Sequence, residues 1–406
     1  MDIIIKDAAN RGKIKAIDSK SIAIRKILMA AIFKKETVIR LNNYSNDIKD
    51  ILNALKALGN EIKIKENKVY IKKGKIKHAS IHIDKSATAF RLLFPSIGFF
   101  TKDAKIYISK QLEKRNSDDL FLNMKNIGYE IKGKNPIFIK SDKLKEGDFK
   151  FSNVISSQFI SACLIYIAKN GGKIGFDRLV SKDYINLTID CLKEFGIYIK
   201  EKNNEFVVEK IINTNNINYE IEGDYSNASY FLSAGAFGDV LVENLNLIST
   251  QADRRILNIL KDYGAKVEGS RVIKNQYNFL EVDIEENIDL FSILAILMTK
   301  NGGILKNIQR LRYKESNRID SMASMLDRLS AKFEIGENYF KVYKSKLKGG
   351  AIESFDDHRI VMAAAIARNL TKEDIIIKDY EAVNKSYPTF FEDFEKLGGK
   401  FEIRRL

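Results

Sequence analysis

Charged and polar residues recur at the expected starts of apolar helices, where they could bind a ligand with several negative charges. Ser21 and Arg25 lie four residues apart and so share one face of a helix. Similar polar openings precede the apolar stretches after residues 86, 156, 314 and 357. We place five cations in the first turns of these helices, where they oppose the positive end of the helix dipole. A bound anion, with phosphate as the first candidate, would compensate this cost; the cations are Arg25, Arg91, Lys314, Arg318 and Arg359.

Helix capping is the alternative explanation for the serines, threonines and aspartates at these positions, and it accounts for each of them taken singly. It does not account for the cations. Neither a Walker-type phosphate loop nor a dinucleotide fingerprint is present. His78 and His82 stand in a strand-like stretch without metal-ligand spacing, and Cys163 and Cys191 read as buried small hydrophobes. We therefore predict no metal site.

The composition favours a globular protein and restricts the location and partners. The chain has 406 residues, 68 Lys and Arg against 53 Asp and Glu, and a net charge of +15. We attribute most of this charge to diffuse surface lysines, because abundant Lys, Ile and Asn with three prolines and no tryptophan are typical of AT-rich coding. The apolar runs are shorter than the ~18–20 residues that cross a bilayer, and the first residues lack a secretory pattern. We expect a cytoplasmic protein with no membrane segment.

An internal repeat predicts the architecture. Six segments of the form apolar-x-x-apolar-Gly, or close to it, end at positions 59, 128, 196, 264, 330 and 398, which lie 66 to 69 residues apart. Each reads as a helix that ends at a glycine with positive φ and continues into an alternating strand. Ser330 replaces glycine in the fifth copy and should be strained. Three copies before about residue 222 and three after it predict two similar α/β domains with a short hinge near Gly223-Asp224.

At these residues the sequence resembles the enolpyruvyl transferase family, in its 5-enolpyruvylshikimate-3-phosphate synthase branch (3-phosphoshikimate 1-carboxyvinyltransferases). The resemblance covers nearly the whole chain, and the motifs are individually weak but specific together. They are Ser19-Lys20-Ser21 with Arg25, Ser86-Ala87-Thr88-Ala89-Phe90-Arg91, Ser156-Ser157-Gln158-Phe159, Leu179-Val180-Ser181-Lys182-Asp183-Tyr184-Ile185, Gly223-Asp224-Tyr225-Ser226-Asn227-Ala228-Ser229-Tyr230, Leu311-Arg312-Tyr313-Lys314-Glu315-Ser316-Asn317-Arg318, Asp357-His358-Arg359 and Val383-Asn384-Lys385-Ser386-Tyr387-Pro388.

The resemblance implies a two-domain inside-out α/β barrel of six βαβαββ-type repeats, three in each domain. Residues 1–19 and 224–406 would form the C-terminal domain, and residues 20–223 the N-terminal domain, with the active site in the cleft between them. The implied reaction transfers the enolpyruvyl group of phosphoenolpyruvate to the 5-hydroxyl of shikimate 3-phosphate in the shikimate pathway, towards chorismate and the aromatic amino acids. No metal or organic cofactor is implied. The expected partners are the two small-molecule substrates, with no nucleic acid, no membrane and a monomeric chain.

The resemblance also implies the site residues. Asp289 would deprotonate the 5-hydroxyl and Glu315 would handle the methyl proton, while the division of proton transfers among Asp289, Glu315 and Lys20 stays open. The residues expected to bind phosphoenolpyruvate are Lys20, Ala87, Arg115, Gln158, Arg318, Arg359 and Lys385. Those expected to bind shikimate 3-phosphate are Lys20, Ser21, Arg25, Ser156, Ser157, Gln158, Ser181, Tyr184, Asp289 and Lys314.

Several positions depart from the family pattern. Ala87 stands where the family usually has glycine, and its methyl group should narrow the space beside phosphoenolpyruvate and weaken binding of the slightly longer inhibitor glyphosate. Lys85 replaces the usual Asn or Glu, and Arg310 stands where many members have Asn. Asp289 is the weakest local motif, because Ile288 replaces the usual proline; the apolar stretch Phe291–Met298 that follows supports it.

Three alternatives remain open. A UDP-N-acetylglucosamine enolpyruvyl transferase would share the fold but would need a reactive cysteine in a loop near the cleft. A basic nucleic-acid-binding protein would need exposed aromatics among its surface cations, and its binding would weaken steeply with salt. A non-catalytic relative would lack key ionisable residues, whereas all of them are present here.

Overall fold

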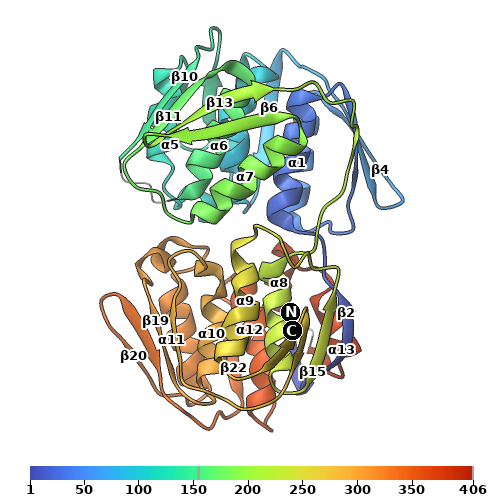
Figure 1. Cartoon of the computed structure of the whole chain (residues 1–406), viewed down its shortest axis with the longest axis vertical. Coiled ribbons are helices and arrows are strands. Elements are labelled where there is room, and N and C mark those ends of the chain that lie inside the picture. Colours follow the sequence, from blue (N-terminus) through green and yellow to red (C-terminus); the bar gives the residue numbers. More distant parts are fainter. Residues whose placement is uncertain (153–155, 405–406) are drawn as a thin grey trace. The chain divides into compact units, whose positions relative to one another are not determined.

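The computed structural model describes residues 1–152 and 156–404. The chain divides into two compact units (Figure 1). The N-terminal unit consists of Asp18–Ile221, and the C-terminal unit combines Met1–Ile17 with Glu222–Leu406. The first seventeen residues therefore fold with the second half of the chain, and the backbone passes between the units twice.

Each unit contains three four-stranded sheets that share one pattern of strand pairing. In every sheet two neighbouring strands are parallel and the remaining pairs are antiparallel, as in the order β6-β7-β9-β8. A helix joins the two parallel strands in four of the sheets, whereas the pairs β14–β3 and β15–β2 bring together strands that are far apart in the sequence. In the β6–β7 pair His78 to Ile83 lie in register with Asp103 to Ile108. The predicted α/β fold with three repeats in each domain is confirmed.

The bounds in the N-terminal unit follow the chain. Its strands are β3 (Glu36–Arg40), β4 (Glu61–Lys65), β5 (Lys68–Lys72), β6 (His78–Ile83), β7 (Asp103–Ile108), β8 (Glu130–Lys132), β9 (Ile137–Lys140), β10 (Gly147–Phe151), β11 (Gly172–Phe176), β12 (Ile197–Lys202), β13 (Glu205–Ile211) and β14 (Asn218–Tyr219). Its helices are α1 (Lys20–Phe33), α2 (Asn46–Ala57), α3 (Ala87–Leu93), η1 (Phe94–Phe99), α4 (Lys110–Glu113), α5 (Asp118–Asn126), α6 (Ser157–Asn170) and α7 (Lys182–Glu194).

The C-terminal unit is built in the same way. Its strands are β1 (Asp2–Asp7), β2 (Arg11–Lys15), β15 (Asp239–Glu243), β16 (Lys266–Glu268), β17 (Arg271–Ile273), β18 (Leu280–Asp283), β19 (Gly303–Lys306), β20 (Phe333–Ile335), β21 (Tyr339–Val342), β22 (Gly350–Glu353), β23 (Ile375–Lys378) and β24 (Lys400–Arg404). Its helices are α8 (Tyr225–Gly235), η2 (Ala252–Arg255), α9 (Ile256–Asp262), η3 (Ile288–Leu290), α10 (Phe291–Met298), η4 (Gln309–Tyr313), α11 (Arg318–Arg328), α12 (His358–Ala367), η5 (Arg368–Leu370), η6 (Tyr380–Lys385) and α13 (Phe390–Lys396).

The core of each unit is made of helices that are apolar on nearly all sides. In the N-terminal unit α1, α3 and α6 pack on one another, and in the C-terminal unit α8, α10 and α12 do the same. Every residue of α10 and α12 is buried, which confirms the burial predicted for residues 360–367 and the apolar helix predicted for 291–298. Such helices need polar partners only at their ends, so the N-termini are where ligand-binding groups can stand. Within the described residues, no helix is both long and apolar enough to span a membrane.

All six repeat positions adopt positive φ. The five glycines have φ between 83° and 103°, and Ser330 has φ 60°. At Ser330 the helix ends in a Schellman arrangement, in which the Ala331 N–H donates to the carbonyl of Leu326 at 2.9 Å. The predicted strain at Ser330 therefore has a structural basis, because a side chain in the left-handed region costs about 1–2 kcal/mol.

The helix starts correct the sequence-based placement of the cations. Helices α1 and α3 begin at Lys20 and Ala87, so Arg25 and Arg91 lie in their second turns. Lys314 precedes α11, which begins at Arg318, because the chain stays extended after the η4 turn. Of the five predicted cations only Arg318 and Arg359 lie in first turns, and Lys20 is the first residue of α1. The positive end of a helix dipole therefore faces fewer of these cations than expected.

Replacing Ser330 with glycine should raise the free energy of unfolding by about 0.5–1 kcal/mol. Glycine removes the left-handed strain, and part of the gain is offset by the greater freedom of the unfolded chain. Urea unfolding measures the change. Gly398→Ser is the matched control: φ is 91° and a new Cβ would meet no atom within 4 Å, so backbone strain alone should destabilise it. A Ser330→Gly protein that is less stable than the wild type would contradict this account.

Candidate active site

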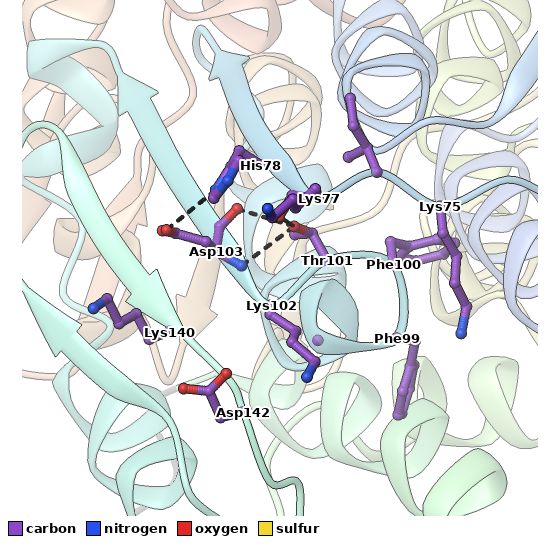
Figure 2. A pocket seen from close by; sticks show the side chains of 12 residues that line it. Lys75, Lys77, His78, Phe99, Phe100, Thr101, Lys102, Asp103, Lys140 and Asp142 are labelled. Carbon is purple, nitrogen blue, oxygen red and sulfur yellow. Dashed lines mark hydrogen bonds and ion pairs between the residues drawn. The ribbon is translucent and has the colours of Figure 1, made fainter.

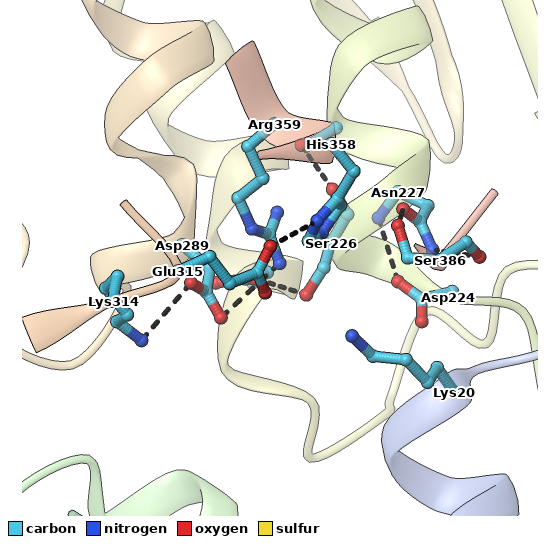
Figure 3. Close-up of polar contacts among 12 residues, drawn as sticks. Lys20, Asp224, Ser226, Asn227, Asp289, Lys314, Glu315, His358, Arg359 and Ser386 are labelled. Carbon is cyan, nitrogen blue, oxygen red and sulfur yellow. Dashed lines mark hydrogen bonds and ion pairs between the residues drawn. The ribbon is translucent and has the colours of Figure 1, made fainter. Parts of the chain in front are cut away.

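In the C-terminal unit three acids and five basic residues gather at the N-termini of α11 and α12. Figure 3 shows most of this group around Asp289 and Glu315, with Lys314 and Arg359 beside them. We call this group the acid–base cluster; it consists of Asp289, Lys314, Glu315, Arg318, Asp357, His358, Arg359 and Lys385. It comes from four separate stretches of sequence, which the packing of α10, α11 and η6 against α12 brings together.

Asp289 is surrounded by cations. One carboxylate oxygen lies 3.0 Å from the Arg318 guanidinium and 3.3 Å from the Lys314 Nζ, and the other lies 3.4 Å from the Arg359 guanidinium. The side chain keeps 19% of its surface exposed. Three positive charges at these distances favour the ionised carboxylate. Asp289 can therefore accept a proton from a hydroxyl group that reaches its exposed edge.

Glu315 is largely withdrawn from water, with a side chain that is 10% exposed, and is still held as an anion. Burial alone would raise the pKa of its carboxyl, but His358, Lys385 and Arg318 outweigh this effect and hold the pKa well below its usual range. The His358 Nδ1 lies 2.8 Å from one carboxylate oxygen, and the Lys385 Nζ lies 3.5 Å from the other. This geometry provides a base with a hydrogen-bonded imidazole behind it, the arrangement used to hold and return a proton.

Asp357 and Arg318 form the base of the cluster. Both side chains are almost completely buried, and the Arg318 Nε lies 3.0 Å from the Asp357 carboxylate. Burial opposes ionisation of Asp357, but Arg318 and His358 prevail and lower its pKa. The same carboxylate accepts the Arg359 backbone N–H at 2.9 Å, as the cap of α12, and the Ser316 hydroxyl at 3.1 Å. Asp357 therefore fixes Arg318 directly, Arg359 through its backbone, and Glu315 through the neighbouring Ser316.

A metal ion has a possible set of ligands here. Ligand atoms of Glu315, Asp357 and His358 lie within 4.8 Å of one another. These carboxylates already face Arg318 and Lys385. A divalent cation would have to occupy a position next to two positive side chains, so the donor set fits ion pairs with protein cations better than it fits a metal.

Asp253 is a buried acid beside this cluster that the sequence did not reveal. Burial and the nearby Asp289 raise the pKa of Asp253 to about 7, and the Ser226 hydroxyl donates a hydrogen bond to it. Nearby, Asp224 caps α8, and the Asn227 side chain bonds to Ser386. These contacts fix Lys385 against α8. Asp253 follows a polar loop and carries no signal of its own in the sequence.

In the N-terminal unit most of the predicted residues stand at or near the starts of α1, α3, α6 and α7, and Arg115 lies between α4 and α5. Lys20 is the first residue of α1, and its Nζ lies 2.9 Å from the buried Asp47 of α2. Ser21 follows it, and its carbonyl accepts a bond from Arg25 at 2.8 Å. Ser181 is the residue before α7, in a left-handed conformation with φ 50°. The sequence did not identify Asp47 as the partner of Lys20.

Arg25 is fully engaged by neutral groups. Its side chain is about 1% exposed, and it donates to the Thr188 hydroxyl at 2.7 Å and to the Tyr184 carbonyl at 3.3 Å. Within the described residues no carboxylate pairs with it. Burial lowers the pKa of Arg25, because a charge removed from water is stabilised only by these dipoles. Arg25 therefore places α1 against α7 and adds positive potential near Ser21 and Tyr184.

Arg91 links the predicted phosphoenolpyruvate residues to one another. It donates to the Gln158 side chain at 3.0 Å and to the Asn116 carbonyl at 2.7 Å, next to Arg115. Gln158 in turn donates to the Thr88 hydroxyl at 2.9 Å. Burial and then the charge of Arg115 lower the pKa of Arg91 to about 9. Two cations that raise each other's energy in this way are typical of an anion site.

The remaining predicted residues lie around Arg91. Ser156 caps α6 by accepting the Gln158 N–H, and the Arg91 guanidinium lies 3.5 Å from its hydroxyl. Ser157 is the first residue of α6 and is buried, and Ala87 is the first residue of α3 and is 2% exposed. The predicted site residues of the C-terminal unit thus all belong to the acid–base cluster, and those of the N-terminal unit lie at several helix starts and around Arg91. Tertiary contacts add Thr88, which accepts from Gln158, and Asp47, which pairs with Lys20, and they connect Arg91 to Gln158.

A hollow of about 550 Å³ in the N-terminal unit contains none of the predicted site residues (Figure 2). It lies where β6 and β7 begin, around His78 and Asp103, whose side chains approach to 3.3 Å. Ala87 follows the C-terminal end of β6, and Arg115 follows the C-terminal end of β7. At about 3.3 Å per residue, six-residue strands separate the two ends by roughly 17–20 Å. The hollow is therefore distinct from the groups described above.

Asp50 is a further acid that the sequence did not single out, and its ionisation should affect stability. Burial raises its pKa from 3.8 to about 6; the Ser86 and Asp84 backbone N–H groups favour the charged form, and the charges of Asp47 and Asp84 oppose it. Because the folded-state pKa is above the unfolded value, Asp50 reduces stability as the pH rises through this interval. Asp50→Asn, which cannot ionise, should raise Tm at pH 8 by about 2–4 °C.

The Tm advantage of Asp50→Asn should disappear near pH 4, where Asp50 is protonated in the folded wild type. Scanning calorimetry between pH 4 and 8 measures it. We use Lys49→Gln, on the exposed side of the same helix, as the control for surface charge. If the Tm advantage of Asp50→Asn instead fell as the pH rose, folding would stabilise the ionised carboxyl of Asp50. That result would contradict the raised pKa.

Known proteins match this chain along almost its entire length. A family model described as EPSP synthase (3-phosphoshikimate 1-carboxyvinyltransferase) matches residues 5–394. The 3-phosphoshikimate 1-carboxyvinyltransferase of Clostridium perfringens is 33% identical, with 98% of each chain covered. That of Clostridium acetobutylicum is 35% identical, with 96% of this chain and 95% of the relative covered. An EPSP synthase structure from Acinetobacter baumannii matches all of both chains with a TM-score of 0.82 and 24% identity, a likeness of fold. The chain belongs to the EPSP synthase family.

Proposed function

We propose that this chain transfers the enolpyruvyl group of phosphoenolpyruvate to the 5-hydroxyl of shikimate 3-phosphate and releases phosphate. Membership of the EPSP synthase family and the names of the relatives support the substrates. The observation that carries the chemistry is the acid–base cluster, in which Asp289 and Glu315 are held among four cations. Proton transfer at two sites and stabilisation of a polyanion are the requirements of this reaction.

The reaction proceeds by addition and elimination. The 5-oxygen bonds to C2 of phosphoenolpyruvate while its hydroxyl loses a proton and the methylene carbon gains one. In the second step the methyl group loses a proton, the bond between C2 and the phosphate oxygen breaks, and the double bond re-forms. Protons balance, because the one lost from the hydroxyl leaves with the phosphate. No redox step occurs.

Asp289 is the base for the 5-hydroxyl in this proposal. Its carboxylate is ionised by Arg318, Lys314 and Arg359 and retains an exposed edge. Glu315 exchanges the proton of the methyl carbon. The lowered pKa keeps Glu315 ionised at neutral pH, so it can accept a proton in the elimination step and acts as an acid only after it has received one. The part that Lys20 takes in these transfers stays a prediction.

The remaining predicted residues bind the substrate anions in this proposal. Phosphoenolpyruvate would be held by Lys20, Ala87, Arg115, Gln158, Arg318, Arg359 and Lys385, and shikimate 3-phosphate by Lys20, Ser21, Arg25, Ser156, Ser157, Gln158, Ser181, Tyr184, Asp289 and Lys314. The proposal requires the residues of both units to meet in one active site. It is supported by their positions at helix starts and by the cations Arg25 and Arg91, which neutral groups alone accommodate.

The sister activity on UDP-N-acetylglucosamine is not favoured. It needs a reactive cysteine thiolate, whereas Cys163 and Cys191 are both buried in helices. Burial raises the pKa of Cys191 to about 12 and that of Cys163 well above its ordinary value. Neither thiol would ionise at neutral pH. A cytoplasmic location and a monomeric state stay predictions.

Glu315→Gln should lower kcat for phosphate release about 10²–10⁴-fold, the usual contribution of a positioned acid or base. The amide retains the shape of Glu315 but exchanges no proton. The assay combines shikimate 3-phosphate with phosphoenolpyruvate and measures inorganic phosphate. Glu337→Gln, an exposed acid of the same unit, is the control and should leave kcat unchanged. Equal rates for the two variants would remove Glu315 from the chemistry, and a wild type that releases no phosphate would refute the proposed function.

Ala87→Gly should increase sensitivity to glyphosate about tenfold, because one methyl group in a binding pocket changes affinity by roughly 1–3 kcal/mol. Ala87 is 2% exposed at the first position of α3, so its methyl group occupies space that glycine would leave open. The inhibition constant against phosphoenolpyruvate measures the effect. Ala89→Gly, at a buried position in the same helix, controls for the added backbone freedom. Identical inhibition constants before and after Ala87→Gly would count against a role for this methyl group.

A further inference from the structure

Helix α2 presents two acids to the interior of the N-terminal unit. Asp47 and Asp50 are three residues apart and therefore share a face of the helix. Asp47 is buried and pairs with Lys20 at 2.9 Å. Asp50 is half-buried and has a different partner, because its carboxylate accepts the backbone N–H of Ser86 at 3.2 Å. The two acids thus contact two separate stretches of the expected binding site.

The segment held by Asp50 connects β6 to α3. It consists of Asp84, Lys85 and Ser86, and Ala87 follows it directly. Ser86 also caps α3, since its hydroxyl accepts the Ala89 N–H at 3.2 Å. Helix α2 packs against both β6 and α3. The carboxylate of Asp50 therefore fixes the backbone at the point where the chain turns from the strand into the helix.

The position of this segment also affects Gln158. Thr88, two residues beyond Ser86, accepts a hydrogen bond from the Gln158 side chain at 2.9 Å. Gln158 in turn accepts one from Arg91 at 3.0 Å. Ala87, which precedes Thr88 in the chain, and Gln158 are both expected to contact phosphoenolpyruvate. The hydrogen bond between Thr88 and Gln158 links these two residues. A shift of the Ser86 backbone would displace both.

An ionised carboxyl at this place has a cost. It is partly withdrawn from water and lies near the acids Asp47 and Asp84. A leucine would avoid this cost and would suit the helix, whose neighbouring residues Ile51 and Ala54 are buried. A local cost at a ligand-facing segment is typical of residues retained for function.

We propose that Asp50 is a positioning residue for phosphoenolpyruvate, which acts by accepting the Ser86 N–H and so fixing the segment that carries Ala87 and Thr88. This inference rests on the proposed function, since it concerns the binding of that substrate. Asp50 touches no substrate in this account. The alternative is a purely structural tie between α2 and the turn into α3.

Two substitutions separate positioning from a structural tie. Asp50→Leu removes the acceptor, and Asp50→Asn retains an oxygen acceptor of the same size. Asn53→Leu, on the exposed side of the same helix, is the matched control for adding a leucine to α2. Steady-state phosphate release gives kcat and the KM of each substrate, and thermal unfolding reports stability in the same preparations.

Asp50→Leu should raise the KM for phosphoenolpyruvate about tenfold or more, because small misplacements of binding groups are costly. The KM for shikimate 3-phosphate and kcat should stay within about twofold, and Asp50→Asn should restore the KM for phosphoenolpyruvate to within about twofold of the wild type. An unchanged KM for phosphoenolpyruvate in Asp50→Leu overturns the proposal. Equal increases in both KM values with a fall in Tm, or a failure of Asp50→Asn to restore binding, overturn it in favour of a structural tie. Phosphate release by the wild type distinguishes these outcomes from a failure of the proposed function. A wild type that releases no phosphate would overturn both the proposed function and this inference.

Discussion

The buried ion pair between Arg318 and Asp357 is the interaction on which the C-terminal group of site residues depends. Two charges withdrawn from water gain stability only if their geometry and remaining hydrogen bonds are satisfied. Here Asp357 also caps α12 through the Arg359 N–H and accepts the Ser316 hydroxyl. Arg318 also reaches Asp289. Removing either charge would take away the main buried partner of the other, so the arrangement of Asp289, Glu315 and Arg359 is inseparable from the stability of the unit.

This constraint explains how two carboxylates stay ionised in a site that must also attract polyanions. Each acid is surrounded by more than one cation, so the group retains positive charge around Asp289 and Glu315. The charges are fixed before any substrate arrives, because Arg318, Arg359 and Lys385 are buried and held by neighbouring groups. Such preorganised charge costs no rearrangement during the reaction. The same network favours proton transfer and phosphate binding.

The sequence predicted those features that depend on local pattern. The spacing of the glycines predicted the helix ends, and the continuous apolar stretches at 291–298 and 360–367 predicted the buried helices α10 and α12. It misplaced Arg25, Arg91 and Lys314 relative to their helix starts, since N-cap geometry decides which of several polar residues begins a helix. It also missed Asp47, Asp50 and Asp253. Acids in polar stretches look solvated in a sequence, and only the partners that the fold brings near them reveal their burial.

The two units accommodate their buried cations differently, and this difference suits different tasks. In the C-terminal unit Arg318 and Arg359 face carboxylates, so the charge is largely balanced and the acids are available for proton transfer. In the N-terminal unit Arg25 and Arg91 face hydroxyls, an amide and carbonyls, and burial lowers the pKa of both. Dipoles stabilise a buried cation less well than an anion does. In the proposed function, a substrate phosphate or carboxylate near Arg25 or Arg91 therefore gains more than it would beside a paired arginine. On this proposal the N-terminal unit supplies the stronger anion receptor, and the acid–base cluster of the C-terminal unit is the proton-transfer centre.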